Sequence, residues 1–407
     1  MRVSHKLLTV ASPIALLSGA PALAQAADQP AGASADESSA TQDIVVTAQR
    51  REQSLLKVPL AISVVGNEAL QSKGISASSE LASAVPNLQV SSPFSIIPNF
   101  TMRGIGVGNE YNANQASPVG VYIDDAYVAS RASQGLQIFD LERVEVLRGP
   151  QGTLYGRNTT GGAINFVTRA PKLSGNNGFV ELGYGNFDDR QAQAAVELTL
   201  VDDQLGLRIA GTYEKNDGLI RNVVPGTPRP NSTDSLSGRV TLRIKPGNGA
   251  VDIRLKGFAA RSDGTQVGVH GITASRAGLG FFETAHGIVA EQPMRVQGGQ
   301  ANIKIDISDR ITLNSVTSLQ SGKGYVVQEA DGSPLPVLYD DLRSETKEFN
   351  QEIRLNYDTD RLHLVGGAYY GSDRNATNNL FNIGGTTGFL QSFVQKRKSY
   401  AAFAQGD

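Results

Sequence analysis

The stretch IFDLERVEVLRGPQGTLYGRNTTGGAINFVTR, residues 138–169, decides the fold of the first half of this chain. Two runs in it, 143–147 and 163–168, are rich in β-branched residues and predict strands. Between them lie five glycines, which predict close backbone approaches and positive φ angles. The phosphate-loop template is not met, because no Lys-Ser or Lys-Thr pair follows a GxxxxG spacing. A generic cluster of β-turns stays open on physical grounds alone.

The residues before this stretch complete a small mixed α/β unit over 51–169. The run 58–65 reads as a strand with Pro59 near its start, where a missing N–H is tolerated. Residues 68–73 predict one or two helical turns ended by Gly74, and 79–84 predict a second short helix. The alternating run 119–123 predicts a strand that enters a turn at Asp124-Asp125.

Short strings in this unit resemble the plug domain of TonB-dependent outer-membrane receptors in both order and spacing. They are VPNL at 85–88, RG at 103–104, YIDD at 122–125, VEVLRGP at 144–150, LYG at 154–156 and GGAIN at 161–165. Most family members have Asp-Gly where this chain has Asp124-Asp125, a departure confined to one turn. The resemblance covers 43–169, and beyond that range the family expectation rests on pattern.

After Pro171 the sequence pattern changes. Segments of about ten residues alternate apolar and polar side chains, which is the pattern of a transmembrane β-barrel. A soluble β-sandwich alternates as well. The polar face here carries many full charges, as a water-filled or plugged lumen would. The residues expected on the convex, lipid-facing side include Val180, Leu182, Val196, Leu198, Leu207, Ile209, Leu242 and Ile253.

The connections between these segments alternate in length, as in outer-membrane barrels. Tight turns are predicted at 201–203, 246–249, 308–309 and 358–360, and long polar loops at 215–235, 259–297, 321–344 and 371–395. The pattern gives nine strands and the start of a tenth, from about residue 396. We therefore expect a mainly β protein in which 172–407 form an incomplete antiparallel barrel, with about ten of the 22 strands of a plugged barrel. An open edge in lipid is costly, so this chain is expected to be part of a longer one.

The N-terminus has the three-part layout of a secretory signal peptide over residues 1–24. A basic start precedes an apolar stretch at 7–17, and Ala22-Leu23-Ala24 provides a cleavage signal. The apolar stretch is too short for a membrane-spanning helix, which needs about 20 residues. Residues 25–42 are rich in Ala, Ser and acids without periodicity, which predicts a disordered linker.

A short β-branched run follows the linker: Asp43, Ile44, Val45, Val46, Thr47 and Ala48. No partner strand is apparent nearby, and a lone strand satisfies its backbone groups by adding to the sheet of another protein. The alternative is that the run is the first strand of the next domain. The run resembles a TonB box, which implies that TonB, with its inner-membrane energising complex, binds these residues.

Composition excludes several classes of function. The chain of 407 residues has no cysteine and four histidines, with a formal net charge of −2. Disulfides are therefore excluded, no metal site or cofactor is expected, and nucleic acid is not an expected partner. No Ser-His-Asp order or supported carboxylate pair is present, so we expect no enzyme. Asp124-Asp125 are read as turn residues.

The resemblance implies a function in the outer membrane of a Gram-negative cell. Such receptors import scarce, bulky nutrients, such as iron–siderophore complexes, by TonB-dependent active transport. The alternative is a passive structural barrel or adhesin without energy coupling. Outward plug tips would contact the ligand, which points to Arg103, Asn109, Tyr111 and Tyr155. Arg103 could instead pair with a carboxylate of the plug or barrel. The identity of the ligand is left open.

Overall fold

The computed structural model describes residues 45–75, 78–92, 97–107, 115–247, 249–269 and 278–407. Contacts divide the chain into two units, 1–42 and 43–407, and the described residues all belong to the second. The predictions made for the signal peptide at 1–24, the linker at 25–42, and residues Asp43, Ile44, Asn109 and Tyr111 lie outside the described residues.

The predicted mixed α/β unit is built on a five-stranded sheet with the order β3-β8-β9-β6-β7. β6 and β9 run parallel, and the other neighbours are antiparallel. Two short α-helices, short 3-10 helices and a two-stranded sheet, β4-β5, complete the unit. The bounds are β3 Ile62–Gly66, α1 Asn67–Ser72, the 3-10 helix η2 Ser78–Ser83, β4 Leu88–Ser91, β5 Asn99–Met102, β6 Val119–Ile123, β7 Ala126–Tyr127, the 3-10 helix η3 Arg131–Ser133, β8 Leu141–Arg148, α2 Gly152–Tyr155 and β9 Gly162–Thr168.

The core of this unit lies around β8 and β9, and all seven residues of β9 are buried. Gly162 shows why glycine is needed in the stretch 138–169. Its φ is 152°, and an added Cβ would lie 2.3 Å from the Leu147 carbonyl oxygen and 2.3 Å from the Met102 sulfur. The predicted close backbone approach is confirmed here. The predicted strand at 58–65 is too long, because β3 begins only at Ile62.

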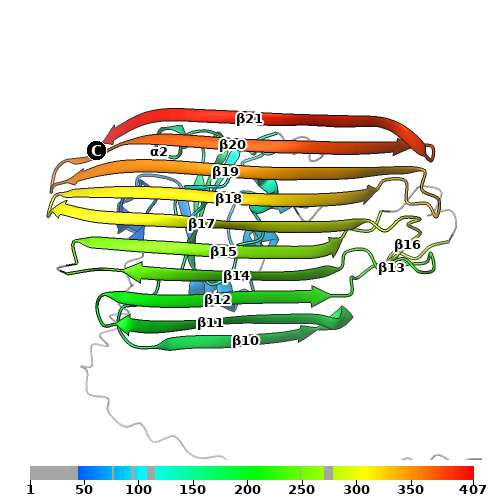
Figure 1. The fold of residues 1–407 in the computed structure, drawn as a ribbon, viewed down its shortest axis with the longest axis horizontal. Helices are drawn as coiled ribbons and strands as arrows, with labels where there is room; N and C mark the ends of the chain where they lie inside the picture. Colours follow the sequence, from blue (N-terminus) through cyan, green and yellow to red (C-terminus); the bar gives the residue numbers. More distant parts are fainter. Residues whose placement is uncertain (1–44, 76–77, 93–96, 108–114, 248, 270–277) are drawn as a thin grey trace, which may run out of the picture. The chain divides into compact units, whose positions relative to one another are not determined.

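Residues after 171 form one ten-stranded antiparallel sheet whose strands follow chain order (Figure 1). A parallel pair, β13 (Arg221–Asn222) with β16 (Glu283–Thr284), joins two of its connections. The strands are β10 Asn177–Gly185, β11 Asp189–Val201, β12 Leu205–Asn216, β14 Thr233–Ile244, β15 Val251–Thr265, β17 Glu291–Ser308, β18 Ile311–Glu329, β19 Leu338–Asp358, β20 His363–Ile383 and β21 Thr386–Gly406.

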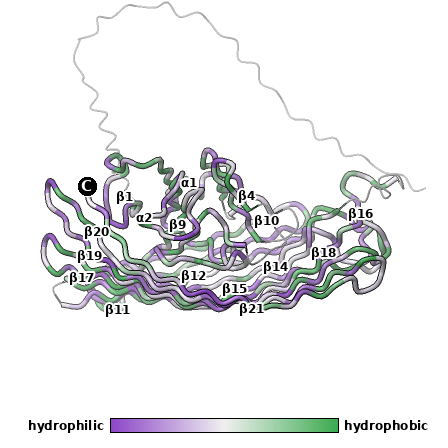
Figure 2. The backbone as a smooth tube through the Cα atoms, turned by 90° about the horizontal axis from the view of Figure 1, so that it is seen from above, coloured by the Kyte–Doolittle hydropathy of each residue, from purple (hydrophilic) through white to green (hydrophobic). Residues whose placement is uncertain are grey.

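The small unit lies on one face of this sheet (Figure 2), and charged or amide side chains of the sheet reach it across that face. The other face is apolar, as predicted. Val180 and Leu182 are 74% and 76% exposed. Register places the remaining predicted residues on the same side, because paired residues share a face: Val196↔Ile209, Leu198↔Leu207↔Leu242, and Ile253↔Ile244.

The tight turns are confirmed, but two of the predicted long loops are wrong. Residues 371–395 are mostly strand, since β20 and β21 are joined by Gly384-Gly385 alone, both with positive φ. Residues 321–344 are interrupted only between Glu329 and Leu338. In these segments the backbone hydrogen bonds between strands continue after the alternation of apolar and polar side chains has ended. The prediction failed because it relied on that alternation to recognise a strand. No helix in the described part of the chain is long and apolar enough to cross a membrane.

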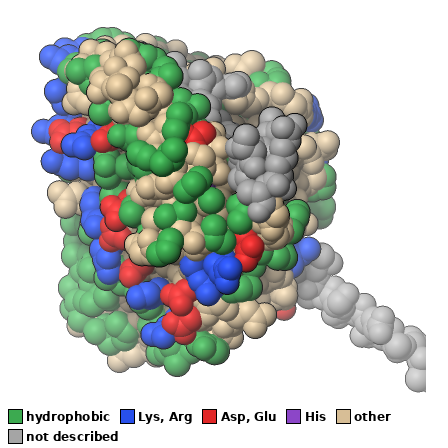
Figure 3. All heavy atoms as spheres, turned by 90° about the vertical axis from the view of Figure 1, so that its right-hand side faces the viewer, with side chains coloured by type: hydrophobic (Ala, Val, Ile, Leu, Met, Phe, Trp, Pro, Cys, Tyr) green, Lys and Arg blue, Asp and Glu red, His purple; other side chains and the backbone are tan. Residues whose placement is uncertain are grey.

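Figure 3 views the rim of the sheet at which β12 and β20 end and the longer connections lie. Basic and acidic side chains lie beside one another on this rim. Ion pairs there include Lys323–Glu345 at 3.0 Å and Arg343–Asp341 at 2.9 Å. We call this edge the loop rim and the opposite edge, with the tight turns, the turn rim.

Candidate functional site

The first described residues, Val45 and Val46, form a strand, β1, that pairs antiparallel with β2 (Gln53–Ser54). The prediction that this run has no local partner strand is therefore wrong. The chain reverses between the two strands through a turn in which Arg50 N–H donates to the Thr47 carbonyl at 2.8 Å. Val46 and Ala48 are fully buried against the small unit. This packing holds β1 in a position that β propensity alone did not predict.

Thr47 is bound by a carboxylate on β8. Its backbone N–H donates to Glu145 Oε1 at 3.0 Å, and its hydroxyl donates to Glu145 Oε2 at 2.9 Å. The same carboxylate accepts from Arg143 Nε at 2.8 Å. Glu145 is fully buried, so these donors compensate for its desolvation.

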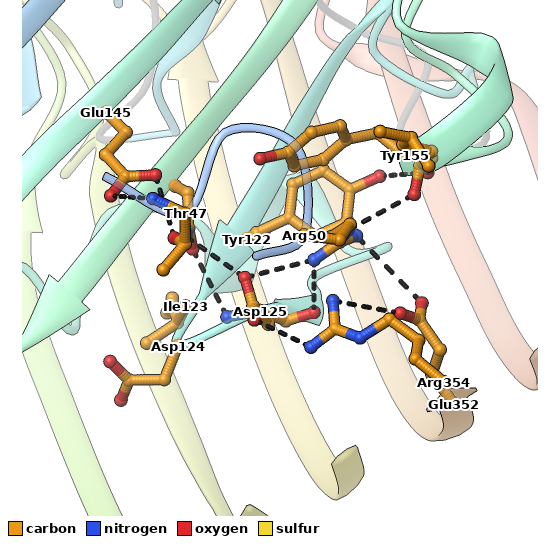
Figure 4. A network of polar contacts seen from close by, with 12 residues as sticks. Thr47, Arg50, Tyr122, Ile123, Asp124, Asp125, Glu145, Tyr155, Glu352 and Arg354 are labelled. Atoms are coloured by element: carbon orange, nitrogen blue, oxygen red, sulfur yellow. Dashed lines mark hydrogen bonds and ion pairs between the residues drawn. The ribbon is translucent and has the colours of Figure 1, made fainter. Parts of the chain in front are cut away.

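Arg50 follows the run and is the centre of a larger cluster (Figure 4). Its side chain is 1% exposed, and Nη1 lies 3.0 Å from Asp125 Oδ1 while Nη2 lies 3.9 Å from Glu352. Nε donates to the Leu154 carbonyl at 3.2 Å. The guanidinium also lies over the Tyr155 ring, 4.1 Å from its centroid.

Asp125 is shared between two arginines. Besides Arg50, it accepts from Arg354 Nη2 of β19 at 3.0 Å, and Arg354 also contacts Glu352 at 3.2 Å. Burial alone would raise the pKa of Asp125, but Arg354 and Arg50 outweigh burial and hold that pKa at about 2. The carboxylate is thus ionised at neutral pH. Charges of alternating sign connect the N-terminal segment, the turn after β6 and strand β19 of the ten-stranded sheet. We call Arg50, Asp125, Glu352 and Arg354 the Arg50 cluster.

The neighbouring Asp124 anchors the same turn to other strands of the ten-stranded sheet. Its carboxylate lies 2.7 Å from Lys256 Nζ of β15 and accepts from the Thr168 backbone at 2.7 Å. Gln300 and Asn302 of β17 donate to its carbonyl oxygen at 2.8 and 2.9 Å. Asp124 and Asp125 both have positive φ, 46° and 69°, as expected of turn residues. An L residue in this conformation costs about 1–2 kcal/mol, which these contacts offset.

The structure places the two described ligand-contact candidates differently. Arg103 is exposed, and no carboxylate of the described residues forms an ion pair with it. Tyr155 is 5% exposed and lies edge-on to Tyr122, with ring centroids 5.0 Å apart. The Tyr122 hydroxyl donates to its carbonyl oxygen. Tyr155 therefore packs against Arg50 and does not lie at an exposed tip.

Sequence reasoning missed Arg50, Glu352 and Arg354 as functional candidates. The available signal was the second Asp of Asp124-Asp125, at a turn position where the family resemblance implies glycine. A charge at a position that favours glycine indicates that the side chain has a partner. Nothing in the sequence indicated which of its many arginines that partner would be.

The family model described as TonB-dependent Receptor Plug Domain matches residues 54–163. Residues 54–163 are therefore a plug domain of the TonB-dependent receptor type, and the chain is similar to TonB-dependent receptors. We therefore call residues 51–169 the plug and the ten-stranded sheet the wall. The predicted fold class, a plug with a large antiparallel sheet of the outer-membrane receptor type, is confirmed.

Curated relatives include the pesticin receptor of Yersinia pestis, 29% identical over 226 residues, which are 55% of this chain and 32% of that protein. The vitamin B12 transporter BtuB of Vibrio vulnificus strain YJ016 is 29% identical over 238 residues, 56% of this chain and 36% of that protein. The chain thus spans about a third of the length of these relatives.

Solved structures with the same fold include the ferric yersiniabactin uptake receptor FyuA from Yersinia pestis. Its TM-score is 0.73 at 19% identity, over 85% of this chain and 61% of that chain. The ferripyoverdine receptor of Pseudomonas aeruginosa bound to ferripyoverdine gives a TM-score of 0.74 at 15% identity, over 91% of this chain and 52% of that chain. TonB-dependent receptors are outer-membrane proteins, and the family consists of receptors and transporters.

Proposed function

We propose that this chain serves in TonB-dependent active import of a scarce, bulky nutrient, such as an iron–siderophore complex, across the outer membrane. Residues 1–24 would direct export, residues 43–48 would bind TonB, and lipid would cover the apolar face of the wall. The ligand would contact Arg103, Asn109, Tyr111 and Tyr155 together with the loops. Relatives named for ferripyoverdine, ferric yersiniabactin and vitamin B12 support a bulky ligand.

The observation that carries this proposal is the attachment of residues 45–50. An importer in the outer membrane has no ATP and must receive work from elsewhere, so it needs a segment through which force reaches the plug. β1 is held by one two-residue strand pair, Thr47 next to it is held by Glu145, and Arg50 follows with bonds to plug and wall. Strand addition by TonB would compete with the short β1–β2 pair. Force on β1 would then act first on Thr47 and next on the Arg50 cluster.

A passive barrel or adhesin is the second candidate. Such a protein needs no plug and no buried charge cluster beneath its N-terminal segment. Burying charges has a desolvation cost even when they are paired, so a cluster of this kind is unexpected without a role. The arrangement therefore favours energy-coupled import.

The test uses Val46→Pro in the receptor of the native host, because proline removes the backbone donor that an added strand needs. Val46→Ile is the matched control, since it keeps both the donor and the buried apolar side chain. The probe is the ferric siderophore secreted by that host, labelled with radioactive iron. We expect Val46→Pro to abolish accumulation while surface binding persists. Accumulation at the wild-type rate would contradict the proposal, and binding without any TonB-dependent accumulation in the wild type would favour the passive barrel.

A further inference from the structure

A second site lies between the plug and the wall, away from the Arg50 cluster. It is a cavity of about 490 Å³ bounded on the plug side by α1, the start of η2 and residues 135–141. Its wall side is made by β10, β11, β12, β14, β15 and β17. Thr233 begins β14 and Thr265 ends β15, and both line the cavity, so it reaches the loop rim. We call this cavity the vestibule.

Strand register shows which side chains of the wall line the vestibule. One cross-strand row runs Gln191↔Glu214↔Ser235↔Ser262, and the next runs Glu181↔Gln193↔Thr212↔Ser237. All eight residues line the cavity. Each row combines one carboxylate with amide and hydroxyl side chains, which offer both donors and acceptors. The surface is suited to a ligand that forms many hydrogen bonds.

The charge of the vestibule is negative. No Lys or Arg is among the described residues that line it, whereas Glu181, Glu214 and Asp140 are. Glu214 is half-buried and forms no ion pair with a described residue, and the negative charges of Asp189 and Glu80 act on it as well. Carboxylates held near one another without cations repel an anion and attract a cation.

Only the inner end of the vestibule is neutralised. Asp140 lies there, 2.6 Å from Arg208 Nη2 of β12 and 3.4 Å from Arg239 Nη2 of β14. Arg208 also pairs with Glu197 of β11 at 3.0 Å. All four side chains are buried, so they separate the vestibule from the turn rim. The free negative charge therefore lies toward the loop rim, where a ligand would enter.

We propose that the vestibule is a binding site for a neutral or cationic ligand rich in hydrogen-bonding groups, and that its two acidic rows exclude polyanions. The inference rests on the proposed import function and specifies its substrate class. It adds the wall rows of β10–β15 and the plug face of α1 to the ligand contacts proposed at the plug tips. Glu214 is the residue expected to set the charge preference.

These 407 residues contain no cysteine, so a thiol introduced among them allows a direct test in a receptor whose remaining sequence is kept free of cysteine. Ser235 is the cross-strand neighbour of Glu214, so Ser235→Cys places a single thiol in the vestibule. Its rates of modification by a cationic and an anionic methanethiosulfonate reagent are compared. Thr386→Cys, at an exposed position of the loop rim, is the control. We expect the cationic reagent to be favoured at Ser235→Cys by on the order of tenfold over its preference at Thr386→Cys.

Adding Glu214→Lys to Ser235→Cys should remove or reverse this preference, while Glu345→Lys, on the exposed rim, should leave it unchanged. Binding of a cationic ferric trihydroxamate should likewise exceed that of an anionic ferric tricatecholate in the wild type and fall in Glu214→Lys. Resistance of the plug to protease shows that each variant is folded. Glu214→Gln, which keeps the shape, should give an intermediate preference.

Equal rates for the two reagents at Ser235→Cys, or a preference that Glu214→Lys leaves intact, would overturn the inference. The result is separable from the proposed function through Val46→Pro. If the charge preference is absent and accumulation still depends on Val46, only the vestibule assignment fails. If the preference is present and accumulation does not depend on Val46, the import proposal fails while the vestibule stands as a binding site.

Discussion

Arg50 and Asp125, which are 75 positions apart in the chain, lie with Nη1 and Oδ1 3.0 Å apart and join the N-terminal segment to the turn after β6. Arg354 of β19 lies at the same distance from the same carboxylate. One anion thus holds two cations from different parts of the molecule. Breaking a buried pair by removing one partner costs more than the pair itself contributes, because the remaining charge is left uncompensated. Loss of the Asp125 carboxylate should therefore destabilise the cluster more than loss of any other of its side chains.

Asp125→Asn should destabilise the docking of the plug by about 3–5 kcal/mol, because it leaves two buried arginines with one weaker counter-ion between them. Urea titration, followed by protease cleavage of the released plug, measures the change. Asp203→Asn is the matched control, since Asp203 also has positive φ, 59°, but lies in an exposed turn. The control should change stability by less than about 0.5 kcal/mol. Equal effects of the two substitutions would show that the backbone conformation matters and the ion pairs do not.

The Arg50 cluster should be insensitive to pH until strongly acid conditions. The pKa of Asp125 is held at about 2, below the ordinary value near 3.9. A carboxyl whose folded-state pKa is lowered contributes stability above its unfolded pKa and loses it as pH falls toward the folded value. A spin label attached at Val45→Cys, a half-exposed position, should therefore stay immobilised down to about pH 4. It should become mobile as the pH approaches 2. Combining the label with Asp125→Asn should abolish this transition.

Tyr155→Ala and Tyr155→Phe should differ sharply. The alanine removes a buried ring from beneath Arg50 and should cost about 3–5 kcal/mol. The phenylalanine keeps the ring, and the Tyr155 hydroxyl is buried without a hydrogen-bond partner among the described residues, so it should cost less than about 1 kcal/mol. Thermal unfolding of the plug measures both.

Ligand contact at the plug tips is tested with Tyr155→Phe, which keeps the buried ring, and with Tyr111→Ala. Weaker binding of the host's ferric siderophore with unchanged folding would support the contact. Unchanged affinity in both variants would assign binding to the loops and the wall.

Two glycines of the 138–169 stretch should respond unequally to alanine. At Gly162 an added Cβ would overlap the Leu147 carbonyl and the Met102 sulfur, so Gly162→Ala should cost about 3 kcal/mol or more. At Gly156, with φ 72°, nothing lies within 4 Å of the Cβ position, so only the conformational cost of about 1–2 kcal/mol should appear. Urea denaturation of the plug ranks the two variants, and a Gly156→Ala at least as damaging as Gly162→Ala would contradict the steric explanation.

The sequence by itself determined the two parts of the fold, because local rules govern both. Period-two alternation in segments such as 194–200 specifies which side chains face away from the plug, since successive residues of a strand point to opposite faces. The glycines of 149–162 specify a tight turn region, because Gly149 and Gly156 adopt positive φ and no side chain fits at Gly162. These rules could not predict where the long strands end, because backbone pairing in β18–β21 continues into segments where the alternation of apolar and polar side chains is lost.

Only the tertiary structure decided how the N-terminal segment is held and which charges are partners. Val46 acquires a strand partner because the chain turns back within a few residues and its side chain is buried in the plug. Arg354 and Asp125 are 229 positions apart in the chain. They meet because the pairing of many strand residues brings the wall strand and the plug turn together. An ion pair depends on distance and burial, and neither is a property of the charged residues in the sequence.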